Sequence, residues 1–149
     1  MPVTGVAEFE RFFRSVASLD VDKADLKRYE EFVDRKVRDL LLRGVANAKA
    51  NGRDVIEPSD LPVTKGLEES IHDFERVDEQ IGTARLIEGL IAHPPLDATL
   101  SDETEQELPH VAGGMSVALA RTFRVIDPGV RNPSPEHWER SFRIFDLLL

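Results

Sequence analysis

The feature that most constrains the fold of this chain is an apolar seam between residues 24 and 50. Apolar side chains recur there at intervals of three and four, which places them on one face of an α-helix roughly 40 Å long. The seam consists of Leu26, Tyr29, Val33, Val37, Leu40, Leu41, Val45 and Ala48, whereas Arg35, Lys36, Arg38 and Arg43 are expected to point largely elsewhere. One three-helix unit cannot bury both sides of so long a helix, so we expect a second unit to pack against it.

Shorter helices are predicted on both sides of this long helix. The first runs from about residue 6 to 18, and Asp22 then suits the N-cap of the long helix. Asn51-Gly52 is a stop signal, and a short strap over residues 53–57 follows it. Pro58 is expected to open the third helix, because its missing N–H would have no intrahelical partner in the first turn. The apolar faces of the two flanking helices are formed by Val6, Phe9, Phe12, Phe13 and Val16, and by Leu67, Ile71 and Phe74.

The same order of elements recurs after residue 77. A short helix is predicted from residue 78 to 92, followed by the break His93-Pro94-Pro95. Ser101 suits the cap of a long segment that ends at Asp127-Pro128-Gly129, and Ser134-Pro135 opens a last helix. A displacement of 77 residues pairs Phe9 with Leu86, Phe13 with Leu90, Leu19-Asp20 with Leu96-Asp97, Leu40 with Val117, Leu42 with Leu119, Gly52 with Gly129 and Pro58 with Pro135. We therefore predict one compact all-α domain over residues 1–149, built from two related halves, 1–77 and 78–149.

The second long helix contains Pro109 and the pair Gly113-Gly114. A proline inside a helix removes a backbone hydrogen bond and clashes with the preceding turn, so a kink is expected. One interpretation is a functional hinge. The other, which we favour, is a tolerated bend at which glycine admits the backbone of the partner helix.

Residues 51–61 read NGRDVIEPSDL, and this segment resembles the end of the long helix and the strap of an archaeal histone. In that family a Gly-Arg pair closes the long helix, and an aspartate stands seven positions after the arginine, as Arg53 and Asp60 do here. The resemblance implies an ion pair that braces the strap, a role that suits the planar guanidinium group. The alternative is a surface arginine and an N-cap aspartate without mutual contact.

Over its whole length, including the ending from Glu136-His137-Trp138 to Leu149, the chain resembles a bacterial family of uncharacterised proteins with two histone folds fused head to tail. The resemblance implies an intramolecular histone-like pseudodimer, in which the long helices cross and each strap lies beside the first loop of the other half. Two positions depart from the histone pattern. Val55 stands where archaeal histones place a DNA-contacting threonine, and Val130 and His137 replace the ion pair, so the second half should lack that brace.

Composition excludes several classes of protein. The chain has 19 Lys+Arg against 28 Asp+Glu, a formal net charge of −9, whereas a protein that coats nucleic acid is usually basic. It has no cysteine, which excludes disulfides, thiolate metal sites and a catalytic thiol. No stretch reaches ~20 uninterrupted apolar residues, and residues 1–5 do not form a secretory signal. We therefore expect a soluble, cytoplasmic protein without a membrane partner. Within the cytoplasm, the nucleoid is the location that DNA binding would imply.

Histones hold DNA with paired loops and first helices, whose Lys, Arg and main-chain N–H groups contact phosphates with little base readout. The candidate DNA-binding residues here are Arg11, Arg14, Lys23, Lys27, Lys49, Arg53 and Arg131. So few cations predict weak, sequence-nonspecific and strongly salt-sensitive binding of double-stranded DNA, typical of a nucleoid-associated protein. The alternative for the whole protein is a protein-interaction module that has kept the histone fold and lost DNA binding. The alternative for each of these residues is that it lies on a solvated helix face and contacts no ligand.

The last helix is apolar on more than one side. Trp138, Phe142, Phe145 and Leu149 form one stripe, and Ile144, Leu147 and Leu148 lie outside it. We expect this helix to be sandwiched within a monomer that acts as an intramolecular dimer. The alternative is that part of it binds another protein.

The sequence carries no pattern typical of an enzyme. The four histidines lack metal-ligand spacing, and neither a nucleophile elbow nor a phosphate-binding glycine loop is present. Glu107 with His110, or Glu136 with His137, are expected to be incidental polar positions rather than metal ligands. We therefore expect a non-enzymatic protein without a cofactor or a metal.

Overall fold

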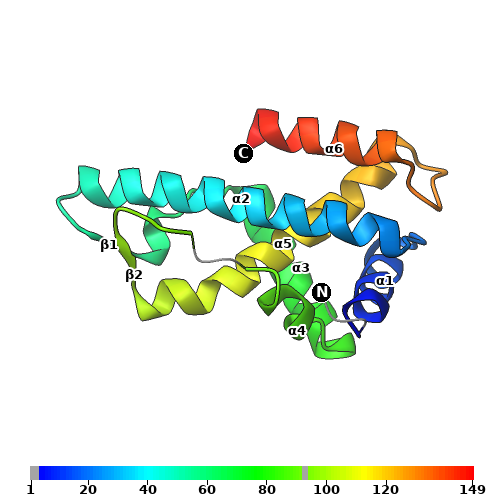
Figure 1. Ribbon diagram of the computed structural model, residues 1–149, viewed down its shortest axis with the longest axis horizontal. Coiled ribbons are helices and arrows are strands. Elements are labelled where there is room, and N and C mark those ends of the chain that lie inside the picture. Colours follow the sequence, from blue (N-terminus) through cyan, green and yellow to red (C-terminus); the bar gives the residue numbers. More distant parts are fainter. Residues whose placement is uncertain (1–3, 92–93) are drawn as a thin grey trace.

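A computed structural model describes residues 4–91 and 94–149, with the side chains of Thr4 and Ala84 left out. In chain order the elements are α1 (Thr4–Ala17), α2 (Lys23–Ala50), β1 (Val55–Ile56), the 3₁₀ turn η1 (Pro58–Asp60), α3 (Lys65–Ile81), α4 (Ala84–Glu88), β2 (Thr99–Leu100), α5 (Asp102–Ile126) and α6 (Pro135–Leu148) (Figure 1). The prediction of an all-α protein is confirmed, because the strands of the described part have two residues each. Residues 1–3, 92 and His93 of the predicted break lie outside the described residues.

The helix boundaries follow local capping signals at most of the predicted places. The Asp22 carboxylate accepts hydrogen bonds from the N–H groups of Ala24 and Asp25 at the start of α2. Gly52, with a φ of 72°, follows the end of the same helix in the left-handed region that glycine tolerates. Ser101 and Ser134 cap α5 and α6 in the same way as Asp22 caps α2.

The region between the two halves differs from the prediction. Pro58 opens only the 3₁₀ turn η1, and α3 begins later, after Thr64 as its N-cap. Helix α3 then continues to Ile81 and ends at Gly82, whose φ is 65°. The predicted helix over residues 78–92 is therefore wrong. Residues 78–81 belong to α3, and the described residues from 82 to 91 contain only the five-residue α4. The physical reason is that Val77 and Ile81 continue the apolar face of α3, so no break occurs before the glycine.

The two long helices contact each other where α5 crosses α2 (Figure 1). At this crossing the hydroxyl groups of Tyr29 and Ser116 are hydrogen-bonded at 2.7 Å in a buried environment. Two further junctions lie at the ends of α2. At one, β1 pairs in parallel with β2, with Val55 opposite Thr99. At the other, the Asp20 N–H donates to the carbonyl of Arg131 at 2.7 Å. The halves are thus joined at the middle and at both ends of α2.

Helix α5 runs without interruption through Pro109 to a glycine pair that admits another helix. A Cβ atom on Gly113 would lie 2.4 Å from the ring of Phe74, and one on Gly114 would lie 2.9 Å from the backbone nitrogen of Ile71. Another helix does approach closely here, with a ring at Gly113 and with its backbone at Gly114. That backbone belongs to α3, however, and not to the long helix α2. The expected kink at Pro109 stays a prediction.

The core is shared by both halves, and Trp138 lies at its centre. This side chain is fully buried against the rings of Phe13, Phe123 and Phe142, with ring centroids 4.8–5.9 Å apart. These four aromatic residues come from α1, α5 and α6. At this cluster an apolar group of the first half is therefore buried against groups of the second.

Lys36 is buried, contrary to the expectation that it points away from the apolar seam. It retains 2% of its accessible surface, and its Nζ donates to the Asp146 carboxylate of α6 at 2.6 Å. The reason is that α6 lies over the outer side of α2, where Phe32 packs on Phe145. Lys36 also holds the pKa of Asp146 below its ordinary value through this hydrogen bond.

Helix α6 is not sandwiched on all sides. Trp138, Ser141 and Phe145 are buried, but Leu147 and Leu148 remain 84% and 74% exposed. The prediction of a fully enclosed last helix is therefore wrong for its last turn, since no other described element covers that side.

Candidate nucleic-acid interface

The seven predicted DNA-binding residues are divided between the two ends of α2. We define the basic end as residues 11–28 together with 124–133, where α1, the start of α2 and the loop after α5 meet (Figure 1, right). It carries Arg11, Arg14, Lys23, Lys27 and Arg131. The opposite end, defined as residues 47–61 and 94–107, carries Lys49 and Arg53 and contains β1 and β2.

The basic end is held together by Arg124, which the sequence analysis did not single out. Its guanidinium donates to the carbonyls of Ala17 and Ser18 at 2.8 and 3.1 Å, and to that of Pro128 at 2.9 Å. Together with the bond between Asp20 and Arg131, these contacts fix the loop after α1 against the loop after α5. The cations of the first half therefore share one end of the molecule with Arg131 of the second half.

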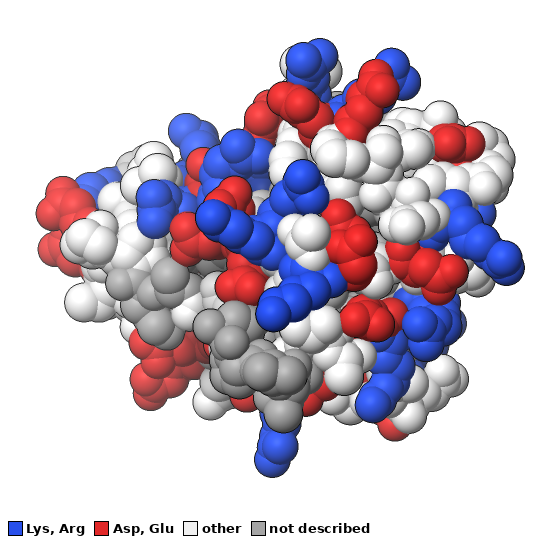
Figure 2. Space-filling view, turned by 45° about the vertical axis from the view of Figure 1, so that its right-hand side comes forward, with Lys and Arg blue, Asp and Glu red and all other residues white. Residues whose placement is uncertain are grey.

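The cations of the basic end are available to a ligand. All five side chains are exposed. Arg14 lies 3.6 Å from the Asp20 carboxylate, a solvent-exposed contact that water screens. The side chains of Arg11, Lys23, Lys27 and Arg131 have no hydrogen-bond or ion-pair partner among the described residues. Figure 2 turns this end toward the viewer and shows blue groups separated by red ones, so the positive charge is clustered rather than continuous.

The cations of the opposite end are already paired with carboxylates of this chain. Lys49 Nζ lies 3.4 Å from Asp54 and 3.3 Å from Asp97, and the hydrogen bond to Asp97 raises the pKa of Lys49. Asp97 was not among the predicted site residues, although the 77-residue displacement places it in the loop equivalent to Asp20. If that loop lies beside the first strap, Asp97 must lie close to Lys49.

Arg53 and Asp60 form the predicted ion pair. Arg53 donates from its two terminal nitrogens to the two oxygens of Asp60, at 2.7 and 2.8 Å, and one of these nitrogens also donates to the carbonyl of Val55. Asp60 additionally accepts from the N–H of Glu57. These charge-assisted bonds hold the pKa of Asp60 at about 2. The pair is a brace for the strap, and it leaves little of the Arg53 guanidinium for a phosphate.

The Arg53–Asp60 pair predicts an acid-dependent contribution to stability. A carboxylate with a lowered pKa stabilises the fold fully above its ordinary pKa of 3.8, and the contribution disappears as the pH falls toward 2. Thermal unfolding of wild type and Arg53→Ala should therefore differ most at pH 5–7 and converge below pH 3.8. A constant difference in melting temperature over this pH range would contradict the assigned role of Asp60.

The second half lacks the Arg–Asp pair and has a brace of a different kind. His137 Nε2 contacts the Asp127 carboxylate at 2.9 Å, and the N–H of Ser134 donates to His137 Nδ1. The hydrogen bond between His137 Nε2 and the Asp127 carboxylate lowers the pKa of Asp127. The strap of the second half is therefore tied from the end of α5 to the start of α6 by histidine instead of arginine.

Comparison with known proteins identifies the family. A family model described as "Domain of unknown function (DUF1931)" matches residues 9–146. The chain belongs to the DUF1931 family. Two proteins of Aquifex aeolicus (strain VF5), both described as uncharacterized, are similar to it. One is 27% identical over 142 residues, covering 95% of this chain and 82% of that protein, and the other is 32% identical over 137 residues, covering 82% and 78%.

Two crystal structures share the fold of this DUF1931 chain. A protein from Thermus thermophilus is 46% identical, with 97% of each chain covered and a TM-score of 0.83. A protein from Aquifex aeolicus is 26% identical, with 97% of this chain and 95% of that chain covered and a TM-score of 0.84. The helical arrangement is thus common to chains of quite different sequence.

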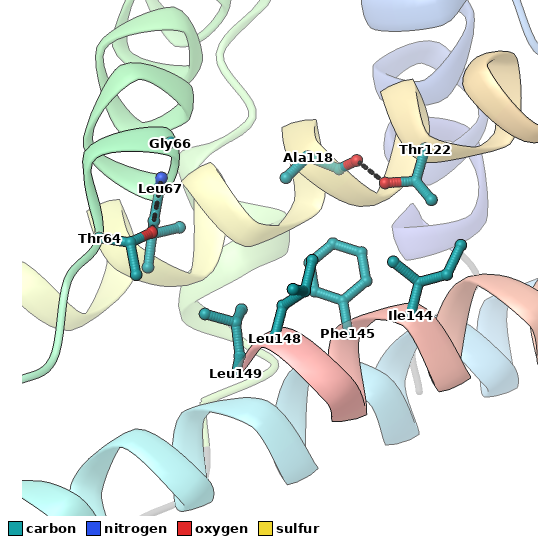
Figure 3. A pocket seen from close by; sticks show the side chains of 9 residues that line it. All are labelled: Thr64, Gly66, Leu67, Ala118, Thr122, Ile144, Phe145, Leu148 and Leu149. Atoms are coloured by element: carbon teal, nitrogen blue, oxygen red, sulfur yellow. Dashed lines mark hydrogen bonds between the residues drawn. The ribbon is translucent and has the colours of Figure 1, made fainter.

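An apolar groove of about 410 Å³ lies beside α6 in this DUF1931 chain (Figure 3). It is lined by Thr64, Gly66, Leu67, Ala118, Thr122, Ile144, Phe145, Leu148 and Leu149, which come from the start of α3, from α5 and from the end of α6. Its hydroxyls are already used, because Thr122 donates to the carbonyl of Ala118 and Thr64 accepts from the N–H of Leu67. The groove therefore offers apolar contact and little else.

The part of this DUF1931 chain that the structure describes contains neither a metal-binding cluster nor a membrane-spanning helix. Within residues 4–91 and 94–149, no three His, Asp or Glu side chains come together in a way that would hold a metal ion. His110 instead lies 3.8 Å from the Glu75 carboxylate on α3. Nor does any helix of this described part have the length and apolar content to cross a bilayer.

Proposed function

We propose that the chain consists of two histone folds in tandem that form an intramolecular pseudodimer. The support comes from the pairing of loops at both ends of α2. At one end the strap of the first half pairs with the segment before α5, through β1 and β2. At the other end the segment before α2 bonds to the strap of the second half, from Asp20 to Arg131. The arrangement departs in one respect from the expected crossing of the two long helices at the glycine pair, because α3 packs closely on α5 through Gly113 and Gly114.

We infer that this pseudodimer is a non-enzymatic protein that binds double-stranded DNA weakly and without sequence preference. The observation that carries the inference is the hydrogen bond between Asp20 and Arg131, because it brings free cations of both halves to one surface. Exposed, unpaired Lys and Arg side chains neutralise phosphates and read no bases. Acting on DNA in this way, the protein would belong to the nucleoid within the cytoplasm.

Fluorescence anisotropy with a labelled duplex of about 20 base pairs tests this function. Wild type should bind at 20 mM salt, and the affinity should fall steeply toward 200 mM, since each neutralised phosphate adds about 0.9 to the log–log salt slope. The double variant Lys23→Ala/Arg131→Ala should bind more weakly at 20 mM salt. Lys65→Ala is the matched control, because Lys65 is 90% exposed but lies at the start of α3. Absence of binding by wild type at 20 mM salt would reject the proposal.

A second candidate function is a protein-interaction module that binds a partner through α6. The groove beside α6 and the exposed side chains of Leu147 and Leu148 favour it. Sedimentation velocity of wild type against Leu148→Glu measures self-association through this side. The module becomes the better candidate if wild type fails to bind DNA at 20 mM salt and associates in a manner that Leu148→Glu abolishes.

A further inference from the structure

The two ends of α2 are built alike but carry opposite charge. The basic end holds seven Lys and Arg against four Asp and Glu, a net charge of +3. The opposite end holds two Lys and Arg against eight Asp and Glu, a net charge of −6. We call the latter the acidic end. In a symmetric dimer the two ends would be equivalent, and here they are not.

We propose that double-stranded DNA contacts only the basic end, so that the protein is a one-ended DNA binder. This inference rests on the function proposed above and specifies its geometry. A duplex that followed both loop pairs would also have to contact the acidic end. There Lys49 and Arg53 are engaged by Asp54, Asp97 and Asp60. The first turn of α5 adds Asp102, Glu103 and Glu105 to the same end of the molecule.

The separation of the two ends allows them to act independently. Helix α2 has 28 residues, which gives a length of about 42 Å at 1.5 Å per residue. The Debye length is about 10 Å at 0.1 M salt, so the field of each end is screened before it reaches the other. The formal net charge of −9 therefore does not prevent a polyanion from binding at the basic end.

One-ended contact limits both the number of phosphates neutralised and the deformation of the DNA. Of the seven Lys and Arg of the basic end, Arg28 contacts Asp25 and Arg124 donates to main-chain carbonyls. The other five set an upper limit of about 4.5 on the log–log salt slope. This limit corresponds to a loss of affinity of about 500-fold between 50 and 200 mM salt. A protein that touches DNA at a single place has no second point from which to bend it.

Salt titrations of single-cation variants test the inference. Lys23→Ala and Lys27→Ala should each reduce the salt slope by about 0.9, which lowers the affinity loss between 50 and 200 mM salt by about 3.5-fold. Lys49→Ala should leave the slope of wild type unchanged, because Lys49 is occupied by Asp54 and Asp97. A 20-base-pair duplex with donor and acceptor dyes at its ends, about 68 Å apart at 3.4 Å per base pair, should show no change in energy transfer on binding.

The possible outcomes separate the inference from the function on which it rests. No binding by wild type at 20 mM salt overturns both. Binding in which Lys49→Ala reduces the slope as much as Lys23→Ala overturns only the one-ended geometry. A rise in energy transfer between the duplex ends has the same consequence, since it would show that the DNA is bent. Circular dichroism and thermal unfolding of each variant confirm that the exposed substitutions leave the fold intact.

Discussion

Replacement of Trp138 by alanine should lower the free energy of unfolding by about 3–5 kcal/mol, the loss typical of deleting a large buried aromatic side chain. Trp138 is fully buried, and its ring contacts those of Phe13, Phe123 and Phe142. The cavity would open between α1 of the first half and α5 and α6 of the second. The loss should therefore fall on the whole molecule rather than on one half.

Urea unfolding followed by far-UV circular dichroism measures this effect. One cooperative transition should persist in Trp138→Ala, with a lower midpoint, because the halves share a core and cannot unfold separately. Leu147→Ala is a matched control on the same helix, since Leu147 is 84% exposed and its change should stay within about 0.5 kcal/mol. Two separated transitions in either variant would mean that the halves are independent domains.

The sequence predicted the features that depend on neighbouring residues. Asp22, Ser101 and Ser134 cap helices as expected, because a cap bonds to N–H groups two or three positions away. The Arg53–Asp60 pair was also predictable, since the resemblance to histones supplied both the interval and the role. The boundary between α3 and α4 was missed, because the 77-residue displacement suggested a break that the continuing apolar face of α3 overrides.

The features that depend on which helices meet were not predictable. Lys36 lies three residues after Val33 and four before Leu40, at the edge of the apolar seam, and the placement of α6 over that edge buries it beside Asp146. The difference between the basic and acidic ends likewise requires the pairing of loops from both halves. Net charge along the sequence could not show it, since Lys49 and Asp97 are distant in sequence and 3.3 Å apart in space.

Alanine substitutions at Gly66 of α3 and at Gly114 of α5 should have opposite effects on stability. In an unobstructed helix, Gly→Ala stabilises by up to about 1 kcal/mol, because alanine loses less backbone entropy on folding. Gly66 is such a position, since nothing lies within 4 Å of an added Cβ atom. At Gly114 the added Cβ atom would lie 2.9 Å from the backbone nitrogen of Ile71, so α3 itself would have to move.

Gly114→Ala should therefore destabilise the protein by about 2 kcal/mol, as the cost of overpacking exceeds the gain in helix propensity. Urea unfolding of Gly66→Ala and Gly114→Ala under one set of conditions gives both signs in a single comparison. A stabilised Gly114→Ala would show that α3 does not approach α5 as closely as these distances require. Because α3 belongs to the first half and α5 to the second, a large loss at Gly114 would show that their contact holds the two halves together.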